Sequence, residues 1–245
     1  MFFEWTPGLA ALLTFALYRM NLSDLKCNAL PLRQMIASYA LPLVYIVPVY
    51  LLTWLFVQGS FHPSPFLTNG AKTVGFPLRP RLATFGIFLP LTLTIGLLAR
   101  FPYTLGEELG WRGFLLPKLR ERYGFTAGCL ITGVTWAFWH YPLLYAFGFF
   151  SRPHANIQIP VFTVMVIGLS FVFGWLRFKT NGLWPCVLMH ASHNAFLQTI
   201  FDPLTASTKK TEYITSEFGA GLMLTISIVA IWLTSTRKTI SKDIR

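Results

Sequence analysis

Long apolar stretches follow one another along this 245-residue chain and limit its fold more than any other feature. The mean hydropathy is +0.54, and only 12% of the residues are charged. In a bilayer the backbone N–H and C=O groups must be paired within the protein, so apolar runs of about 20 residues form helices. The sequence therefore predicts an all-α, polytopic membrane bundle, organised as a single integral membrane domain over residues 1–245.

Eight apolar segments are candidate transmembrane helices. We expect them at residues 6–18, 36–57, 83–98, 103–119, 127–149, 159–177, 183–201 and 214–234. The first and the fourth are short for a bilayer. The fourth also carries charged residues, so its neighbours must enclose it. About eight transmembrane helices around a buried polar site are expected.

The net charge of +11 is spread over the joints between apolar runs, which is typical of membrane topology signals. With eight spans, twelve basic residues fall on one side: Lys72, Arg79, Arg81, Lys118, Arg120, Arg122, Arg177, Lys179, Arg237, Lys238, Lys242 and Arg245. Six fall on the other side, with Arg100 at a short turn: Arg19, Lys26, Arg33, Arg152, Lys209 and Lys210. This asymmetry predicts cytoplasmic termini and gives no reason to expect a nucleic-acid partner.

The three cysteines do not form a recognisable framework. Cys27, Cys129 and Cys186 are odd in number and widely spaced, and the last two lie within apolar runs. They lack the Cys-x-x-Cys spacing of metal or redox motifs, so we expect buried free thiols.

Two adjacent carboxylates, Glu107 and Glu108, stand in a segment that is otherwise apolar. Ionisable groups at membrane depth are costly and mark functional sites, although a solvated pair at a helix end is the alternative. On a helix, Glu108 and Arg112 lie about 40° apart and are natural ion-pair partners, whereas Glu107 points about 100° away from Glu108. Three glycines share the opposite face, where another helix could approach closely: Gly106, Gly110 and Gly113.

Two further apolar segments carry polar groups suited to hydrolysis. His140 follows Trp136 in an aromatic-rich stretch, and His190 and Asn194 are spaced i and i+4, so they share a helix face. An interfacial aromatic belt would also explain His140. Interhelical hydrogen bonding would also explain the His190 and Asn194 pair. Together with the glutamates, these groups form an inventory that suffices for water-activated hydrolysis.

The remaining candidate groups are expected to lie outside the reacting set. His193 is assigned a supporting or structural role. His62 and His154 fall in expected loops and should be exposed. Glu217 precedes the last apolar span and is expected at the membrane interface rather than in the site.

These motifs resemble those of the CPBP family of intramembrane proteases, which includes type II CAAX prenyl endopeptidases and bacterial Abi-type proteins. The motif Glu-Glu-x-x-x-Arg matches Glu107, Glu108 and Arg112, and Phe-x-x-x-His matches His140, with Trp136 in place of phenylalanine. The motif His-x-x-x-Asn matches His190 and Asn194. The three motifs span residues 104–194 in the same order and membrane setting as in the family.

The resemblance implies an eight-helix domain whose site opens towards the cytosol and cuts peptide bonds near the membrane. Some relatives remove a C-terminal tripeptide from prenylated proteins, and others act in bacteriocin immunity or peptide maturation. The motifs do not specify whether the substrate is prenylated. The expected partners are the lipid bilayer and a membrane-associated peptide or protein. The expected location is a cell membrane, if the source is prokaryotic, with the chain multi-pass.

Two mechanisms fit the same residues. In the favoured one no cofactor is needed: Glu107 takes a proton from water, His140 orients that water, and His190 and Asn194 donate hydrogen bonds to the oxyanion. In the alternative, zinc is held by Glu107, His140 and His190 and activates the water. Functions of another class are a proton-coupled transporter or a non-catalytic membrane adaptor. No internal symmetry of the transporter kind is visible in the sequence.

Overall fold

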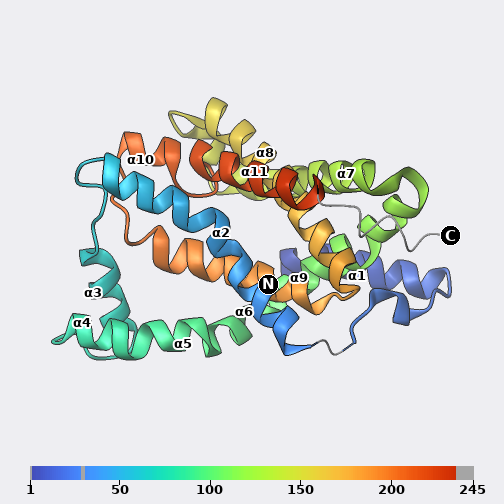
Figure 1. The fold of residues 1–245 in the computed structure, drawn as a ribbon, viewed down its shortest axis with the longest axis horizontal. Coiled ribbons are helices and arrows are strands. Elements are labelled where there is room, and N and C mark those ends of the chain that lie inside the picture. The colour runs from blue at the N-terminus through green and yellow to red at the C-terminus, as the bar shows by residue number, and fades with distance from the viewer. Residues whose placement is uncertain (1, 29–30, 236–245) are drawn as a thin grey trace.

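The computed structural model describes residues 2–28 and 31–235, and across these residues it is a bundle of helices without a strand (Figure 1). Three helical stretches are long and apolar enough to cross a membrane: Leu32–Phe56, Pro80–Ala146 and Ala155–Thr180. Many large apolar side chains face outwards, among them Phe56 at 81% and Ile228 at 64% exposure. A water-soluble surface would not carry so many, whereas lipid solvates them. The chain is therefore a helical membrane bundle, as the composition predicted.

The helices follow the apolar segments closely in most of the chain. The longer ones are α1 (Phe2–Leu17), α2 (Leu32–Phe56), α6 (Ile95–Glu108), α7 (Leu116–Ala146), α8 (Ala155–Thr180), α9 (Trp184–Asn194) and α11 (Ala220–Ser235). Short helices fill the joints: η1 (Leu22–Leu25), α3 (Ser64–Thr73), α4 (Pro80–Ala83), α5 (Leu89–Leu93), η4 (Phe149–Ser151) and α10 (Lys209–Ile214). Three wide, π-helical turns interrupt the regular helices: η2 (Thr84–Phe88), η3 (Leu109–Leu115) and η5 (Ala195–Phe201).

The predicted turn at Arg100 is wrong. Arg100 lies inside α6, so the expected third and fourth spans belong to one helical run, which bends at Thr94, where φ is −122° and ψ is −84°. The guanidinium of Arg100 donates to the Gly96 carbonyl at 3.1 Å and to the Thr199 hydroxyl at 2.8 Å. Because tertiary contacts satisfy this arginine within the bundle, it does not need a turn at the membrane surface.

The chain reverses direction at Gly124, which divides α7 into two arms. Gly124 has φ 80° and ψ 173°, a conformation that residues with a side chain rarely adopt. Gly128 on the second arm lies against the backbone of Leu119 and Arg120 on the first. The second arm packs on α8, and α8 also packs on α11. The main core of the molecule lies between these helices, α2 and α9.

Because two expected spans are one run, the predicted division of loops between the two membrane sides is also wrong. The Leu183 amide donates to the Lys26 carbonyl at 3.0 Å, so the loop after α1 lies beside the end of α8. At the other end of the bundle, the His62 amide donates to the Leu204 carbonyl at 2.8 Å. Both pairs join segments that the sequence had assigned to opposite sides.

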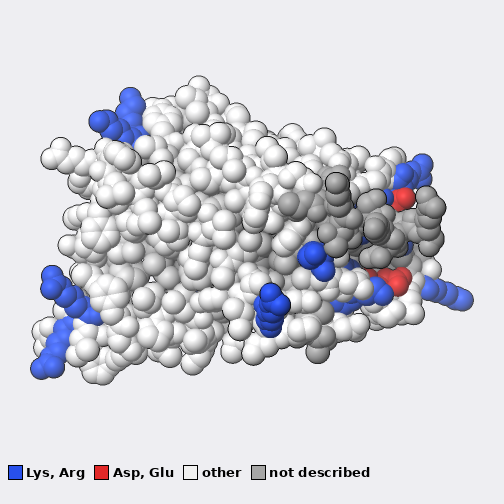
Figure 2. Space-filling view, viewed as in Figure 1, with Lys and Arg blue, Asp and Glu red and all other residues white. Residues whose placement is uncertain are grey.

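Charged residues mark these two ends of the molecule. On the face shown in Figure 2, lysine and arginine lie at the left end and over the right half, and a broad uncharged region lies between. One end carries Arg19, Lys26, Arg33, Lys118, Arg120, Arg122, Arg177 and Lys179; the other carries Lys72, Arg79, Arg81, Arg152, Lys209 and Lys210. The basic tail that the topology prediction counted, Arg237 to Arg245, lies outside the described residues.

Candidate active site

The two glutamates lie at the C-terminal end of α6, and the opposite face of this segment packs against α1. A Cβ atom added at Gly106 would lie 2.8 Å from the Glu4 carbonyl oxygen, and one at Gly110 would overlap Pro7. Only glycine therefore permits this approach of α1, as the spacing of the glycines predicted. Gly113, the third residue of that face, packs against Leu25 instead. The seam between α1 and α6 leaves the glutamate side chains facing the interior of the bundle.

Glu108 is fully buried and makes two strong contacts through one oxygen. Its Oε1 accepts from Arg112 Nη1 at 2.9 Å and from His190 Nδ1 at 2.8 Å. Both Glu108 and Arg112 have 0% exposure, so the alternative of a solvated interfacial pair does not hold. The ion pair predicted from the i and i+4 spacing is present, although Arg112 belongs to the wide turn η3 rather than to a regular helix. Such π-helical turns occur frequently at functional sites.

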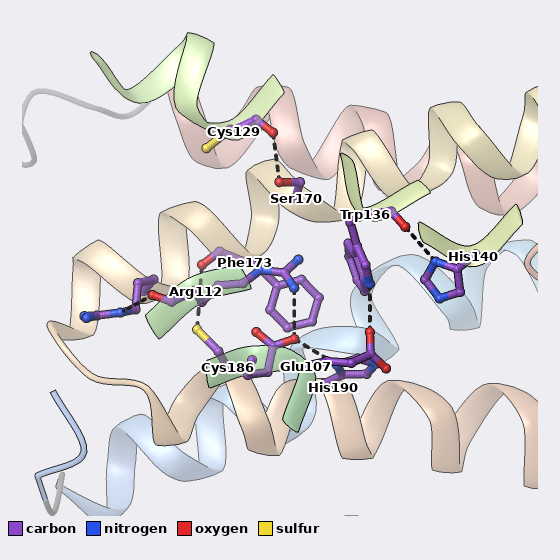
Figure 3. A network of polar contacts seen from close by, with 11 residues as sticks. Glu107, Arg112, Cys129, Trp136, His140, Ser170, Phe173, Cys186 and His190 are labelled. Carbon is purple, nitrogen blue, oxygen red and sulfur yellow. Dashed lines mark hydrogen bonds and ion pairs between the residues drawn. The ribbon is translucent and has the colours of Figure 1, made fainter. Parts of the chain in front are cut away.

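The guanidinium of Arg112 lies between two aromatic rings (Figure 3). Its Cζ atom is 4.1 Å from the ring centroid of Trp136 and 4.1 Å from that of Phe173. Its Nε and Nη2 atoms have no hydrogen-bond partner among the described residues, so the ring faces provide the remaining electrostatic contact. The Arg112 carbonyl accepts from Arg177 Nε at 3.0 Å, which fixes the backbone of the turn.

Glu107 belongs to a separate set of contacts. Its Oε2 accepts from the indole Nε1 of Trp136 at 2.8 Å, and its side chain is 7% exposed. The Trp136 carbonyl in turn lies 2.8 Å from His140 Nδ1. The residue that replaces the usual phenylalanine of the second motif therefore contacts both Glu107 and His140.

The hydrogen bonds define which nitrogen of each catalytic candidate is available. A carbonyl oxygen only accepts, so His140 Nδ1 must donate to Trp136 and its Nε2 is left free. An ionised carboxylate also only accepts, so His190 Nδ1 donates to Glu108 and its Nε2 is left free as well. Both imidazoles are oriented by a bond on one side and keep the other nitrogen for chemistry.

One cavity of about 190 Å³ collects most of the predicted site residues. Its polar lining consists of Glu107, His140, His190, His193, Asn194, Gln198 and Glu217. Four of the six predicted catalytic residues are in that lining, whereas Glu108 and Arg112 lie behind it and hold His190. The groups therefore come from the three predicted segments and from a fourth that precedes α11.

The expectation that Glu217 stays outside the site is wrong, because Glu217 lines this cavity. The loop before α11 folds back over the bundle, and Gln198 Nε2 donates to Glu217 Oε1 at 3.1 Å. No local spacing in the sequence indicates this contact. A carboxylate in an apolar stretch was the available signal, since an isolated acidic residue in a membrane protein needs a partner.

The other histidines differ in their surroundings. His193 Nδ1 lies 2.9 Å from the hydroxyl of Tyr45, in agreement with a supporting role, although the ring also lines the cavity. His62 is exposed as expected. His154 is half-buried, with its ring 4.9 Å from that of Tyr213, so the expectation of an exposed loop histidine is wrong.

The alternative zinc ligands, Glu107, His140 and His190, do not converge into a coordination site in this conformation. Across the described residues, no three His, Cys, Asp or Glu side chains converge closely enough to hold a metal ion. The thiols of Cys129 and Cys186 are buried as expected, whereas Cys27 is exposed, so the expectation of a buried thiol is wrong for Cys27. His140 and His190 each keep a free Nε2, but together with Glu107 they do not form a closed set of ligands.

A helical membrane bundle whose polar cavity is lined by a carboxylate, imidazoles and a carboxamide is the architecture that the CPBP resemblance implied. Residues 85–196 match the family described as type II CAAX prenyl endopeptidase Rce1-like. Over these residues the chain is similar to CAAX-protease-like membrane proteins.

A curated relative is similar over more than half of the chain. "CAAX prenyl protease 2" of Methanococcus maripaludis is 25% identical over 146 residues, which cover 58% of this chain and 49% of the relative. The chain thus spans about half the length of that relative. The name of that relative describes a prenyl protease.

Proposed function

We propose that this chain is an intramembrane endopeptidase that hydrolyses peptide bonds near the membrane surface with water activated by Glu107. The observation that carries the proposal is that Glu107, His140, His190 and Asn194 line one cavity although they come from three segments. The match of residues 85–196 to the family model and the name of the relative support the same class of reaction. The substrate is proposed to be a membrane-associated peptide or protein.

The chemistry follows from the free groups of the lining. A water molecule held between Glu107 and the free Nε2 of His140 loses a proton to the carboxylate and attacks the carbonyl carbon of the scissile bond. Asn194 donates a hydrogen bond to the oxyanion that forms, and His190 in its imidazolium form donates a second one from Nε2–H. Glu107 then returns the proton to the leaving nitrogen, the C–N bond breaks, and the products are an amine and a carboxylic acid, which loses its proton to water.

Glu108 and Arg112 support this reaction without contacting the substrate. The carboxylate of Glu108 accepts from His190 Nδ1–H, which orients the ring and stabilises the imidazolium form that can also donate from Nε2. Arg112 compensates the charge of Glu108, which would otherwise be buried without a counterion. Trp136 holds Glu107 while leaving its other carboxylate oxygen for water.

Cleavage by the purified protein in lipid nanodiscs is the experiment that tests the proposal. The parent protein should cleave members of a library of membrane-associated peptides, and His140→Ala should abolish that cleavage. A parent protein that cleaves nothing but moves protons or solutes in liposomes would replace the protease by the transporter alternative. The rate of cleavage measured before and after treatment with a metal chelator tests the mechanism. We expect the rate to be unchanged. A loss of activity that added zinc restores would support the zinc alternative instead.

We also propose an orientation in the membrane. Among the described residues, eight basic residues lie at the end with η1 and the α7 reversal, against six at the end with α3 and α10. The positive-inside rule therefore supports a cytoplasmic location for the η1 end. The cavity with Glu217 lies away from the contacts of Arg177 with η1, so this orientation places the cavity away from the cytoplasmic end. A site that opens to the cytosol, which the family resemblance implied, requires the opposite orientation. Labelling of Cys27 distinguishes the two orientations.

A further inference from the structure

Glu217 gives the cavity a second carboxylate, contributed by the loop between α10 and α11. Its Oε1 accepts from Gln198 at 3.1 Å, and it lies 3.8 Å from His193 Nε2, which is longer than a hydrogen bond. Its side chain is 26% exposed. Among the contacts of the described residues, its Oε2 has no hydrogen bond, so this oxygen is available to a ligand in the cavity.

The loop that carries Glu217 is held on both sides. The ring of Phe218 stacks on Phe149, with centroids 4.6 Å apart, and on Phe162, with centroids 5.1 Å apart. The Ser216 amide donates to the Tyr50 hydroxyl at 3.0 Å. Neighbours fixed in this way keep the carboxylate at one place on the cavity wall, which is what a recognition group requires.

The charges around the cavity are unbalanced. Its lining contains the carboxylates of Glu107 and Glu217 and the imidazoles of His140, His190 and His193, but no lysine or arginine. Arg112 lies behind the lining and is paired with Glu108. Tyr45, which contacts His193, is neutral at ordinary pH. With His190 protonated, the two carboxylates still leave the cavity with a net negative charge, in a protein whose net charge is +11.

Resting on the proposed protease function, we propose that Glu217 is a specificity-determining residue that receives a lysine or arginine side chain of the substrate beside the scissile bond. A cationic side chain would compensate the second carboxylate and gain a charge-assisted hydrogen bond to the free Oε2. A substrate that places its own C-terminal carboxylate there would face like-charge repulsion. The cavity therefore favours cleavage next to an internal basic residue over release of a short C-terminal peptide at this position.

Binding measurements test this inference without relying on turnover. In a Glu107→Gln background in nanodiscs, peptides that differ only by lysine, norleucine or glutamate at one scanned position are compared by fluorescence anisotropy. We expect the lysine peptide to bind roughly fivefold or more tightly than the norleucine peptide at one position, with the difference shrinking as salt is added. Adding Glu217→Gln should remove that preference, and Glu217→Lys should shift it to the glutamate peptide.

Glu212→Gln is the matched control, since Glu212 is an exposed carboxylate that bonds Ser207 outside this cavity. It should leave the lysine preference intact. Equal binding of the three peptides in the Glu107→Gln background, or a lysine preference that survives Glu217→Gln, overturns the inference. Cleavage by the parent with a charge preference that ignores residue 217 would retain the protease and refute the role of Glu217. Conversely, a Glu217-dependent preference in a protein that cleaves nothing would support the recognition site and refute the protease.

Discussion

Glu107 and Glu108 are neighbours in the chain, yet their carboxylates belong to different hydrogen-bond networks. Glu107 is held by the indole of Trp136, whereas Glu108 is held by Arg112 and His190. The Glu107 carboxylate therefore lines the cavity, whereas the Glu108 carboxylate lies outside the lining and holds His190 in place. This division separates the expected effects of changing either residue.

Glu107→Gln should abolish cleavage while leaving the fold intact. The amide oxygen can still accept from Trp136, but the ionisable base is lost, which typically costs about 100-fold or more in rate. Thermal unfolding in detergent should shift little. Glu108→Gln should lower both the activity and the unfolding temperature, because Arg112 loses its counterion and His190 its charged partner. Equal stability losses in the two variants would contradict the division of roles.

Arg112→Ala should destabilise the protein because it leaves the buried carboxylate of Glu108 without compensation. Breaking such a pair costs about 3–5 kcal/mol in water-soluble proteins. The variant should give less folded protein in fluorescence-detected gel filtration. Glu108→Ala combined with Arg112→Ala should recover part of the loss, since neither charge is then unpaired. A double variant whose loss equals the sum of the single losses would show that the two residues are not coupled.

Asn194→Ala should slow turnover more than it weakens substrate binding. Asn194 lines the cavity and is proposed to donate to the oxyanion, and removing one such donor costs roughly 100- to 1,000-fold in kcat. Ser192→Ala is the structural control on the same helix, because its buried hydroxyl bonds the Met189 carbonyl and does not line the cavity. A fall in kcat of the same size in both variants would assign Asn194 a packing role.

Gly110→Ala should loosen the contact between α1 and the glutamate-bearing segment. An added methyl group would overlap Pro7, whose backbone cannot move aside like a flexible side chain. The expected result is a lower unfolding temperature and a reduced rate of cleavage. Gly86→Ala is the control, because the nearest atom to its added Cβ lies 3.8 Å away on the side chain of Leu82. A Gly110 variant as stable as the Gly86 variant would show that the close seam is unnecessary.

Cys27 should be the native cysteine that a membrane-impermeant maleimide labels, because Cys129 and Cys186 are buried. In the proposed orientation, labelling occurs in inside-out vesicles and not in intact cells, and Cys27→Ser removes it. Labelling of intact cells would instead reverse the orientation. Partial burial raises the pKa of the Cys27 thiol, although nearby Arg177 lowers it. Since only the thiolate reacts, labelling at neutral pH should be slower than for an unperturbed cysteine and should rise as the pH increases.

Local spacing predicted the parts of the site that depend on one helix. Glu108 and Arg112 pair because four residues bring side chains to one face, and the glycine seam follows from the same periodicity. The membrane class followed from hydropathy alone. Contacts between distant segments were beyond such patterns: the bond from Arg100 to Thr199 keeps α6 continuous, and the return of the α11 loop brings Glu217 to Gln198.

The close contact at Gly106 and Gly110 also couples the first helix mechanically to the cavity lined by Glu107. Because the backbones meet closely at these two glycines, α1 and α6 can shift little against each other there. A load applied to α1, by a fused domain, a surface tether or a binding protein, would pass to the turn that bears Glu107. Proteins engineered from this chain could therefore be regulated from the first helix without altering any group that contacts the substrate.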